Sequence, residues 1–367
     1  MTIAISGTTG ITLDGQFNSA SSMGFKNRII NGAMVIDQRN AGASVSTASV
    51  NPFTVDRWQV VSSPASKFTA QQNAGSITPP AGFTNYLGIT SSSAYSSAAG
   101  DLIYILQSVE GYNTADLGFG TANAVTVTLS FRVYSSLTGT FGGALRNYGS
   151  TRSYPFTYTI SSANTWTTIS ITIAGDTSGT WVGASNAGSM VVFFNLGSGS
   201  TYQGTAGAWA AADYRSATGA TSVVGTNGAT FYITGVQLEK GSTATSFDYR
   251  PYGTELALCQ RYYETYSNGT GTGAIYEGIT GSFATTAVFR GFVPFKVTKR
   301  ASPSLVVPTT YTTINWSGGN ITPSAGGSNF SSTEGASINF TTSTVTAGQA
   351  ATAGISSSAP VTISAEL

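Results

Sequence analysis

The sequence predicts an all-β protein, in which an antiparallel jelly-roll β-sandwich is followed by a short connector helix and a smaller C-terminal β domain. Runs rich in Val, Ile, Thr, Phe and Tyr recur along the chain and are bounded by Gly, Asn or Ser, a pattern typical of strands and turns. Only one segment has a good helical pattern. Charged residues make up 8% of the chain and hydrophobic residues 41%, so we expect a folded protein with a neutral, hydroxyl-rich surface.

The first 24 residues predict an attachment arm. Residues 2–13 alternate loosely between apolar and hydroxyl side chains, with Gly7 and Gly10 interrupting the run, and a polar segment follows up to Gly24. These residues contain too few apolar groups for a core, so we expect an extended arm ahead of the first domain, which is a natural docking device. A frayed terminus is the alternative, since chain ends are often poorly ordered.

Residues 25–252 predict the jelly roll. In residues 125–133 apolar side chains occupy every second position, so one face of this strand is expected to be buried and the other to meet solvent. Several short strands separated by turns favour two packed antiparallel sheets over alternating strands and helices. The clearest predicted strands are 101–109, 124–134, 166–174, 189–196 and 229–238.

Residues 253–268 predict the connector helix. Its helical segment is 254–262, which follows Gly253 and has Thr254 as its N-cap. The apolar side chains make more surface than one neighbouring sheet covers, which indicates a contact with a second copy of the chain. Packing within a single chain is the alternative, and for the one cysteine a packing role is favoured over reactivity. The candidate interface residues are Leu256, Leu258, Cys259, Tyr262 and Tyr263.

Residues 269–367 predict a C-terminal β tip domain. Strands are expected at 274–279, 284–297 and 304–307, with Pro294 on an edge or at a bulge because proline has no N–H for a ladder. After Arg300 the only charged residues are Glu334 and Glu366, and large apolar residues are scarce. We therefore expect this region to be stabilised by β packing across chains.

The composition excludes several classes of function. The chain has no histidine and one cysteine, which excludes serine triads, histidine bases, histidine zinc sites and thiolate clusters. The 16 basic and 15 acidic residues give a net charge of +1 and form no basic stripe for nucleic acid. No run is apolar enough for a signal peptide or for insertion into a membrane. We expect no cofactor and no metal.

Paired carboxylates, as in glycoside hydrolases, are the one catalytic device left to test. Asp37 and Asp56 lie next to Arg39 and Arg57, which predicts ion pairs that lower the carboxyl pKa and suit no general acid. Asp176 predicts an Asx-turn rather than a calcium site, because no cluster of acids accompanies it. The remaining candidates flank one predicted strand and are Asp101, Glu110 and Asp116. The protein is therefore expected not to be an enzyme.

Aromatic side chains, at 11% of the chain, are the best candidates for recognition, because sugar rings stack on them. Trp58 and Trp166 begin apolar runs, so we expect both to be buried. Other rings lie in polar, glycine-rich or alanine-rich loops, or flank the turn at Gly318 and Gly319. The candidate glycan contacts are Tyr148, Tyr154, Tyr202, Trp209, Tyr214, Tyr311 and Trp316.

Two stretches of the chain carry a specific resemblance. Residues 25–34 read FKNRIINGAM and are followed by DQRN at 37–40 and TVDRW at 54–58. Residues 231–241 read FYITGVQLEKG, and residues 250–263 read RPYGTELALCQRYY. These stretches resemble the opening and the closing motif of a jelly-roll domain found in phage tail-fibre and prophage structural proteins. In structural terms, the Asn-Gly pair of the opening motif predicts a turn, and its Asp-Arg-Trp run predicts an ion pair beside a buried indole.

The resemblance spans residues 25–264, and TIAISGTTGI at 2–11 is also similar to the start of such fibre proteins. It implies a carbohydrate-binding-module-like sandwich in a virion appendage, assembled in the host cytoplasm as a homotrimer. It further implies that the arm binds other virion proteins and that the protein contacts a host cell-surface glycan. The short arm leaves attachment to tail, neck or capsid open. A polysaccharide-degrading appendage enzyme and a glycan-binding module of a cellular protein are the alternatives.

Overall fold

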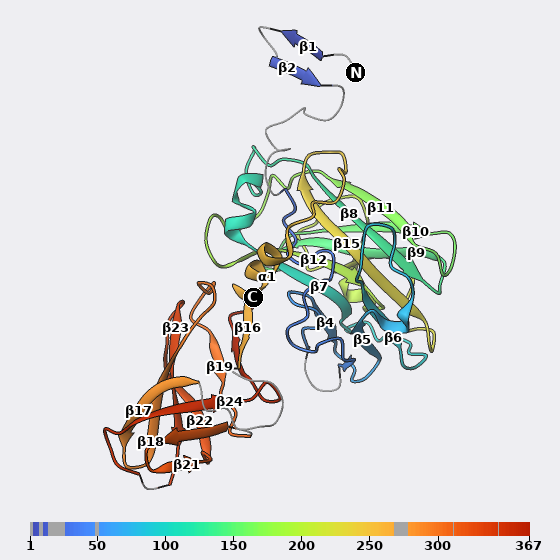
Figure 1. The fold of residues 1–367 in the computed structure, drawn as a ribbon. Coiled ribbons are helices and arrows are strands. Elements are labelled where there is room, and N and C mark those ends of the chain that lie inside the picture. The colour runs from blue at the N-terminus through green and yellow to red at the C-terminus, as the bar shows by residue number, and fades with distance from the viewer. Residues whose placement is uncertain are drawn as a thin grey trace.

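The structure, a computed structural model, describes residues 3–6, 10–13, 26–47, 51–267, 278–310, 312–343 and 345–367. Figure 1 shows a small N-terminal hairpin, a β-sandwich and a C-terminal β domain, with the hairpin and the C-terminal domain at opposite ends of the sandwich. The strands of all the larger sheets are antiparallel to their neighbours. The predicted all-β fold is confirmed.

Two sheets form the sandwich. One has six strands in the order β11-β8-β15-β6-β5-β3, and the other has five in the order β10-β9-β12-β7-β4. A short parallel pair, β13 and β14, lies in a connecting loop. The strands are β3 (Val45–Ser46), β4 (Gln59–Ser62), β5 (Phe68–Gln72), β6 (Leu87–Ser91), β7 (Ile103–Glu110), β8 (Val127–Ser135), β9 (Gly139–Asn147), β10 (Ser153–Ile160), β11 (Thr167–Ile173), β12 (Gly188–Asn195), β13 (Gln203–Gly204), β14 (Ser216–Ala217) and β15 (Thr230–Lys240). Short 3-10 helices lie at Ala74–Ser76, Gly111–Asn113, Ala115–Leu117 and Ser200–Tyr202.

The main core lies between these two sheets because apolar side chains alternate along their strands. Val127, Leu129, Phe131 and Val133 of β8 are fully buried, as the period of two predicts, while Val125 before the strand is partly buried. The outer face of β8 is covered in part, contrary to expectation, because buried Thr128 donates a hydrogen bond to the carbonyl of Gly241 (2.8 Å). Trp58 is fully buried, as expected. Trp166 is only partly buried, because its ring packs on tyrosines of the outer face of the six-stranded sheet.

The five clearest strand predictions are confirmed as β7, β8, β11, β12 and β15. The predicted Asn-Gly turn is confirmed as well, since Asn31 has a φ of 56°. Its side chain donates to the carbonyls of Ile36 (2.8 Å) and Asp56 (2.9 Å), which closes the loop. A Cβ on Gly32 would lie 2.1 Å from the carbonyl oxygen of Val236, so only glycine fits between this turn and β15.

Helix α1 (Tyr252–Gln260) is the predicted connector helix. It begins two residues before the predicted start, with Pro251 in place of Thr254 at the N-cap. The carbonyl of Pro251 accepts the N–H groups of Thr254 (2.9 Å) and Glu255 (3.1 Å), so the first turn is formed without a side-chain cap. The connector was predicted to reach residue 268, but the chain turns after the helix into strand β16 (Tyr263–Tyr266).

The C-terminal domain is a second, smaller sandwich. Its sheets have seven strands in the order β21-β20-β24-β17-β18-β23-β22 and three in the order β16-β25-β19. Strand β16 follows the helix and pairs with β25, the last strand of the chain, so both ends of this domain lie side by side. The strands are β17 (Ile279–Thr285), β18 (Val288–Pro294), β19 (Ser304–Val306), β20 (Thr312–Trp316), β21 (Gly319–Ile321), β22 (Ala325–Ser331), β23 (Gly335–Thr341), β24 (Ala350–Ile355) and β25 (Val361–Ser364).

This domain has an apolar core within the single chain, whereas the β packing across chains that was expected for it stays a prediction. Phe283, Phe289, Phe340 and Ile363 are among its fully buried residues. The apolar side chains are few, but they stand at alternate positions and face inward together. Two of the three phenylalanines also come from strands that precede Arg300.

Two details of the C-terminal strands differ from the prediction. The predicted strand 284–297 contains a turn, since β17 ends at Thr285 and β18 begins at Val288. Pro294 ends the interior strand β18 opposite Gly335 and lies neither on an edge strand nor at a bulge. The prediction at 304–307 is confirmed as β19, while most of 274–279 lies outside the described residues.

The N-terminal arm contains a hairpin where an extended arm was predicted. Strand β1 (Ile3–Ser6) pairs with β2 (Gly10–Leu13) in an antiparallel two-stranded sheet. The loose alternation of residues 2–13 therefore belongs to two strands instead of one. The rest of the arm lies outside the described residues.

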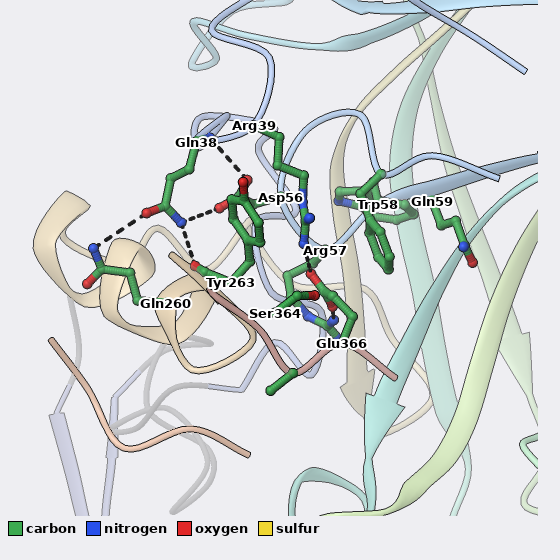
Figure 2. A network of polar contacts seen from close by, with 12 residues as sticks. Gln38, Arg39, Asp56, Arg57, Trp58, Gln59, Gln260, Tyr263, Ser364 and Glu366 are labelled. Atoms are coloured by element: carbon green, nitrogen blue, oxygen red, sulfur yellow. Dashed lines mark hydrogen bonds and ion pairs between the residues drawn. The ribbon is translucent and has the colours of Figure 1, made fainter. Parts of the chain in front are cut away.

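The end of the chain returns to the opening motif. Glu366 pairs with Arg39 (2.7 Å) and with Arg57, as Figure 2 shows. The guanidinium carbons of Arg39 and Arg57 lie 3.5 Å from the ring centres of Tyr263 and Tyr262, respectively. The opening and closing motifs therefore meet through stacked cations and rings, and the penultimate residue of the chain joins them.

Asp56 and Arg57 do not form the predicted ion pair. Arg57 has a φ of 72° and its side chain reaches Glu366, whereas buried Asp56 accepts the backbone N–H (3.1 Å) and the side-chain amide of Gln38 (Figure 2). Burial raises the pKa of Asp56 to about 6, although the hydrogen bonds from Gln38 oppose the shift. Asp37 likewise accepts two backbone N–H groups of its own turn.

Replacing Glu366 by Gln should destabilise the protein strongly, because two largely buried guanidiniums lose their counter-charge. Removing one partner of a buried pair costs about 3–5 kcal/mol. The matched control is Glu334→Gln, which removes an exposed carboxylate of the same domain and should change the free energy of unfolding by less than about 0.5 kcal/mol. Chemical denaturation measures both, and equal midpoints for the two variants would contradict the role given to Glu366.

Asp56 should make stability depend on pH. Its pKa is about 6 in the folded protein against an ordinary 3.8, so the folded state holds the proton more tightly than the unfolded state. The contribution is present in full below pH 4 and is lost as the pH rises through 6. Between pH 4 and pH 7 the free energy of unfolding of Asp56→Asn, relative to wild type, should therefore rise by roughly 2–2.5 kcal/mol. A difference that stays constant over this range would disprove the assignment.

Candidate functional site

A cleft of about 220 Å³ opens where the opening motif, the loop before β6 and the segment leading into α1 meet. The hydroxyl of Tyr249 donates to the carbonyl of Gly82 (2.7 Å), and Arg250 donates to the carbonyl of Ile29 (3.0 Å). These bonds hold three segments together that are distant in sequence. The lining residues are Asn27, Gly32, Ala33, Val35, Gly82, Phe83, Thr84, Phe247, Asp248, Tyr249, Arg250, Tyr252 and Glu255.

Aromatic rings form one wall of the cleft. Phe83, Phe247 and Tyr249 contact one another, with ring centroids 4.8 to 5.5 Å apart. Tyr249 is nevertheless 56% exposed, and Tyr252 at the start of α1 is 65% exposed. Phe83, Phe247 and Tyr249 are thus fixed by one another, and the exposed surfaces of Tyr249 and Tyr252 are available for stacking.

A bulge in β15 makes room for Phe83. The pairing of β15 with β8 shifts between Thr234 and Gln237, and Gly235 within this bulge has a φ of 62°. A Cβ on Gly235 would lie 2.6 Å from Cζ of Phe83. The glycine of the closing motif therefore permits the backbone turn and leaves space for the ring.

Two carboxylates line the cleft and differ in how they are engaged. Asp248 Oδ2 accepts two backbone N–H groups of the opening motif (2.8 and 3.1 Å). Its Oδ1 accepts no hydrogen bond from the part of the chain that the structure describes. Glu255 pairs with Arg250 and accepts the N–H of Asn31. Asp248 therefore keeps an acceptor for a ligand hydroxyl, whereas Glu255 holds the walls together.

This arrangement suits a small ring that has an apolar face and several hydroxyl groups. The volume is below the ~300–1,000 Å³ of pockets for drug-sized ligands, so the cleft suits a small ligand. Among the described residues, no group of three or more His, Cys, Asp or Glu could hold a metal. Nor does the described part of the chain contain a helix that is long and apolar enough to span a bilayer.

The acids that the sequence singled out have partners within the fold. Asp176 forms the predicted Asx-turn, with the N–H of Ser178 at 3.2 Å, and also an ion pair. Asp56 has a pKa of about 6, as a general acid requires, but it is fully buried under Gln38 and is not among the residues of the cleft. The partners are Tyr95 for Asp101, Arg261 for Glu110, Arg28 for Asp116 and Arg152 for Asp176.

The predicted glycan contacts before β11 and in the loop after β12 lie away from the cleft. Tyr148, after β9, is exposed. Tyr154 and Trp209 are partly buried and pack on each other, with ring centroids 5.4 Å apart, and against the main core. Both rings are therefore occupied by contacts within the chain.

The other predicted glycan contacts are also engaged or lie beyond the description. Tyr202 lies under the guanidinium of Arg215, whose carbon is 4.7 Å from the ring centre. Tyr214 is partly buried. Trp316 packs on a buried phenylalanine of the C-terminal core, at 5.6 Å between ring centroids. Tyr311 lies outside the described residues.

Most of the predicted interface residues of the helix are covered by the chain itself. Cys259 and Tyr262 are fully buried and Tyr263 nearly so, and the first two pack against apolar side chains of the opening motif. Burial raises the pKa of the Cys259 thiol, which fits a packing role. The single-chain alternative therefore accounts for these three residues. Leu256 and Leu258 are only partly buried and stay predicted contacts.

Sequence reasoning singled out neither Phe83 nor Tyr249, and it considered Tyr252 only as part of the closing motif. The local signal was the spacing of three aromatic residues at 247, 249 and 252 in polar sequence, ahead of the only helix candidate. No comparable signal marks Phe83, because only the folded chain brings it to these rings.

No protein-family model matches the chain, and no curated protein matches it. Solved structures that match include the enzymatically active domain of tailspike protein 4 of bacteriophage CBA120, at 11% identity and a TM-score of 0.30, covering 59% of this chain and 21% of that one. A family 11 carbohydrate-binding module from Clostridium thermocellum, solved with a mixed-linked tetrasaccharide, matches at 10% identity and a TM-score of 0.28, covering 55% and 98%. The CBM22-1 xylan-binding domain from Paenibacillus barcinonensis matches at 10% identity and a TM-score of 0.25, covering 56% and 99%. At these values the function has to follow from the side chains of the site.

Proposed function

We propose that the protein is a non-enzymatic structural subunit of a bacteriophage virion, a fibre of tail, neck or capsid, that contacts host surface glycans. The observation that carries the glycan contact is the cleft, where two tyrosines that are more than half exposed stand beside an open carboxylate oxygen. The virion assignment is supported by the two motifs, whose residues resemble those of phage fibre proteins and build both the cleft and the domain junction.

The carboxylates of the cleft support binding over catalysis. A glycosidase needs one carboxyl that gives up a proton and a second that acts as base or nucleophile. Glu255 is committed to Arg250 and to a backbone N–H, and Asp248 to two backbone N–H groups. These contacts hold both carboxylates in fixed positions, from which an oxygen can accept hydrogen bonds from sugar hydroxyls.

The subunit is proposed to be a homotrimer held in part by the exposed edge of α1. Leu258 lines a second hollow of about 190 Å³ together with Arg28 and Asn113, so an apolar side chain is presented there among polar groups. The N-terminal hairpin lies at the end of the sandwich opposite the C-terminal domain (Figure 1), which supports attachment by the arm and exposure of the other end.

Removing rings from the cleft should weaken glycan binding without unfolding the protein. Tyr249→Ala and Tyr252→Ala should each lower the affinity for the glycans retained on an array of bacterial surface polysaccharides by about tenfold, or ~1.4 kcal/mol. Tyr112→Ala is the control, because Tyr112 is 61% exposed but is not part of the cleft. Unchanged binding by both cleft variants would refute the site. Release of reducing ends that disappears in Asp248→Asn would refute the non-enzymatic assignment.

A charge at Leu258 should dissociate the trimer. Burying a carboxylate in a contact between copies without a partner is strongly unfavourable, so Leu258→Glu should shift the protein towards monomer. Thr254→Glu, on the same helix, is the control and should leave the mass unchanged. Light scattering at micromolar concentration reads out the result, and a wild-type monomer would end the proposal.

A further inference from the structure

The outer face of the seven-stranded sheet in the C-terminal domain carries two phenylalanines in one row. The inner residues of β18 and β23, such as Phe289, Val293 and Ile338, are buried, so the residues between them point outward. Phe292 on β18 is 57% exposed and Phe330 on β22 is 66% exposed. Large apolar side chains that stay open to solvent on a regular sheet need a reason.

The strand register places both rings on either side of one hydroxyl. Phe292 and Phe330 are each directly opposite Ser337 of the intervening strand β23, so all three side chains share the outer face. Two strand spacings of ~4.8 Å separate the rings by about 10 Å. A Cβ on Gly335 would lie 2.3 Å from Cζ of Phe292, so the glycine lets this ring lie against β23.

The rest of this face is polar and almost without charge. The row continues on β17, β24 and β20 with Thr280, Thr352 and Asn315, which pair in register. Arg290 is the one charged residue in the seven strands of this sheet. The core of an interface between copies of one chain is more apolar than this, since two rings stand here among hydroxyl and amide groups. An uncharged glycan matches the face better, because a sugar ring has an apolar C–H face and hydroxyls at its rim.

We infer that the outer face of β18, β23 and β22 binds a linear, uncharged oligosaccharide that crosses the strands. Two of its sugar rings stack on Phe292 and Phe330, and a hydroxyl between them bonds to Ser337. The class of ligand rests on the proposed function. The site lies in a different domain from the cleft, so an experiment can reject one site without rejecting the other. The protein then binds glycans at two places. The cleft binds a small sugar ligand, and this sheet binds several consecutive units of an oligosaccharide.

The test uses the full-length protein and affinity electrophoresis in gels that contain linear β-glucan, xylan or dextran. At least one of these neutral polysaccharides should retard the wild type, and Phe292→Ser with Phe330→Ser should weaken that retardation about tenfold. Val306→Ser removes an exposed apolar side chain from the three-stranded sheet of the same domain and should leave the retardation unchanged. Unfolding midpoints close to wild type show that the variants remain folded.

Each other outcome overturns the inference. If no neutral polysaccharide retards the wild type, the face does not bind such chains. If Tyr249→Ala abolishes retardation and the phenylalanine variant does not, the cleft binds the glycan alone and only the second site fails. If the phenylalanine variant changes the mass in light scattering while retardation stays the same, the face contacts a second copy of the chain.

Discussion

Among the described residues, the carboxylate of Glu366 is the ion-pair partner of two largely buried guanidiniums of the first sandwich, those of Arg39 and Arg57. Arg39 and Arg57 are stacked on neighbouring tyrosines of the closing motif, which fixes their position but supplies no negative charge. The charge comes from the last strand region of the second domain. The two domains are therefore joined by a largely buried ion-pair network, in which arginines of the first domain depend on a carboxylate of the second.

The same segment serves the junction and the cleft. Residues 247–255 supply both carboxylates of the cleft and all of its rings except Phe83. Tyr262 and Tyr263, which follow helix α1, stack on Arg57 and Arg39. Glu255 lies between the two, since it binds both Arg250 and the backbone of Asn31. Because these hydrogen bonds already fix the side chains of the cleft, little conformational entropy is lost when a ligand binds.

The sequence predicted what depends on local pattern. The alternation along β8 and the Asn-Gly turn were found because each depends on neighbouring residues alone. The ion pair of Asp56 and Arg57 was wrong because the positive φ of Arg57 turns adjacent side chains apart. The cleft was not predicted, since 167 residues separate Gly82 from Tyr249 and nothing in either segment indicates the other. The C-terminal core was underestimated because a few apolar residues suffice when the register brings them to one side.

The scarcity of charge determines how the molecule first meets another surface. Fields from clustered charges speed encounters by about 10–1,000-fold, and salt screens them within ~8–10 Å. A chain with 8% charged residues and a net charge of +1 has only a weak long-range electrostatic attraction to other surfaces, so added salt has little to screen. The rate at which it meets another surface should therefore depend little on the salt concentration.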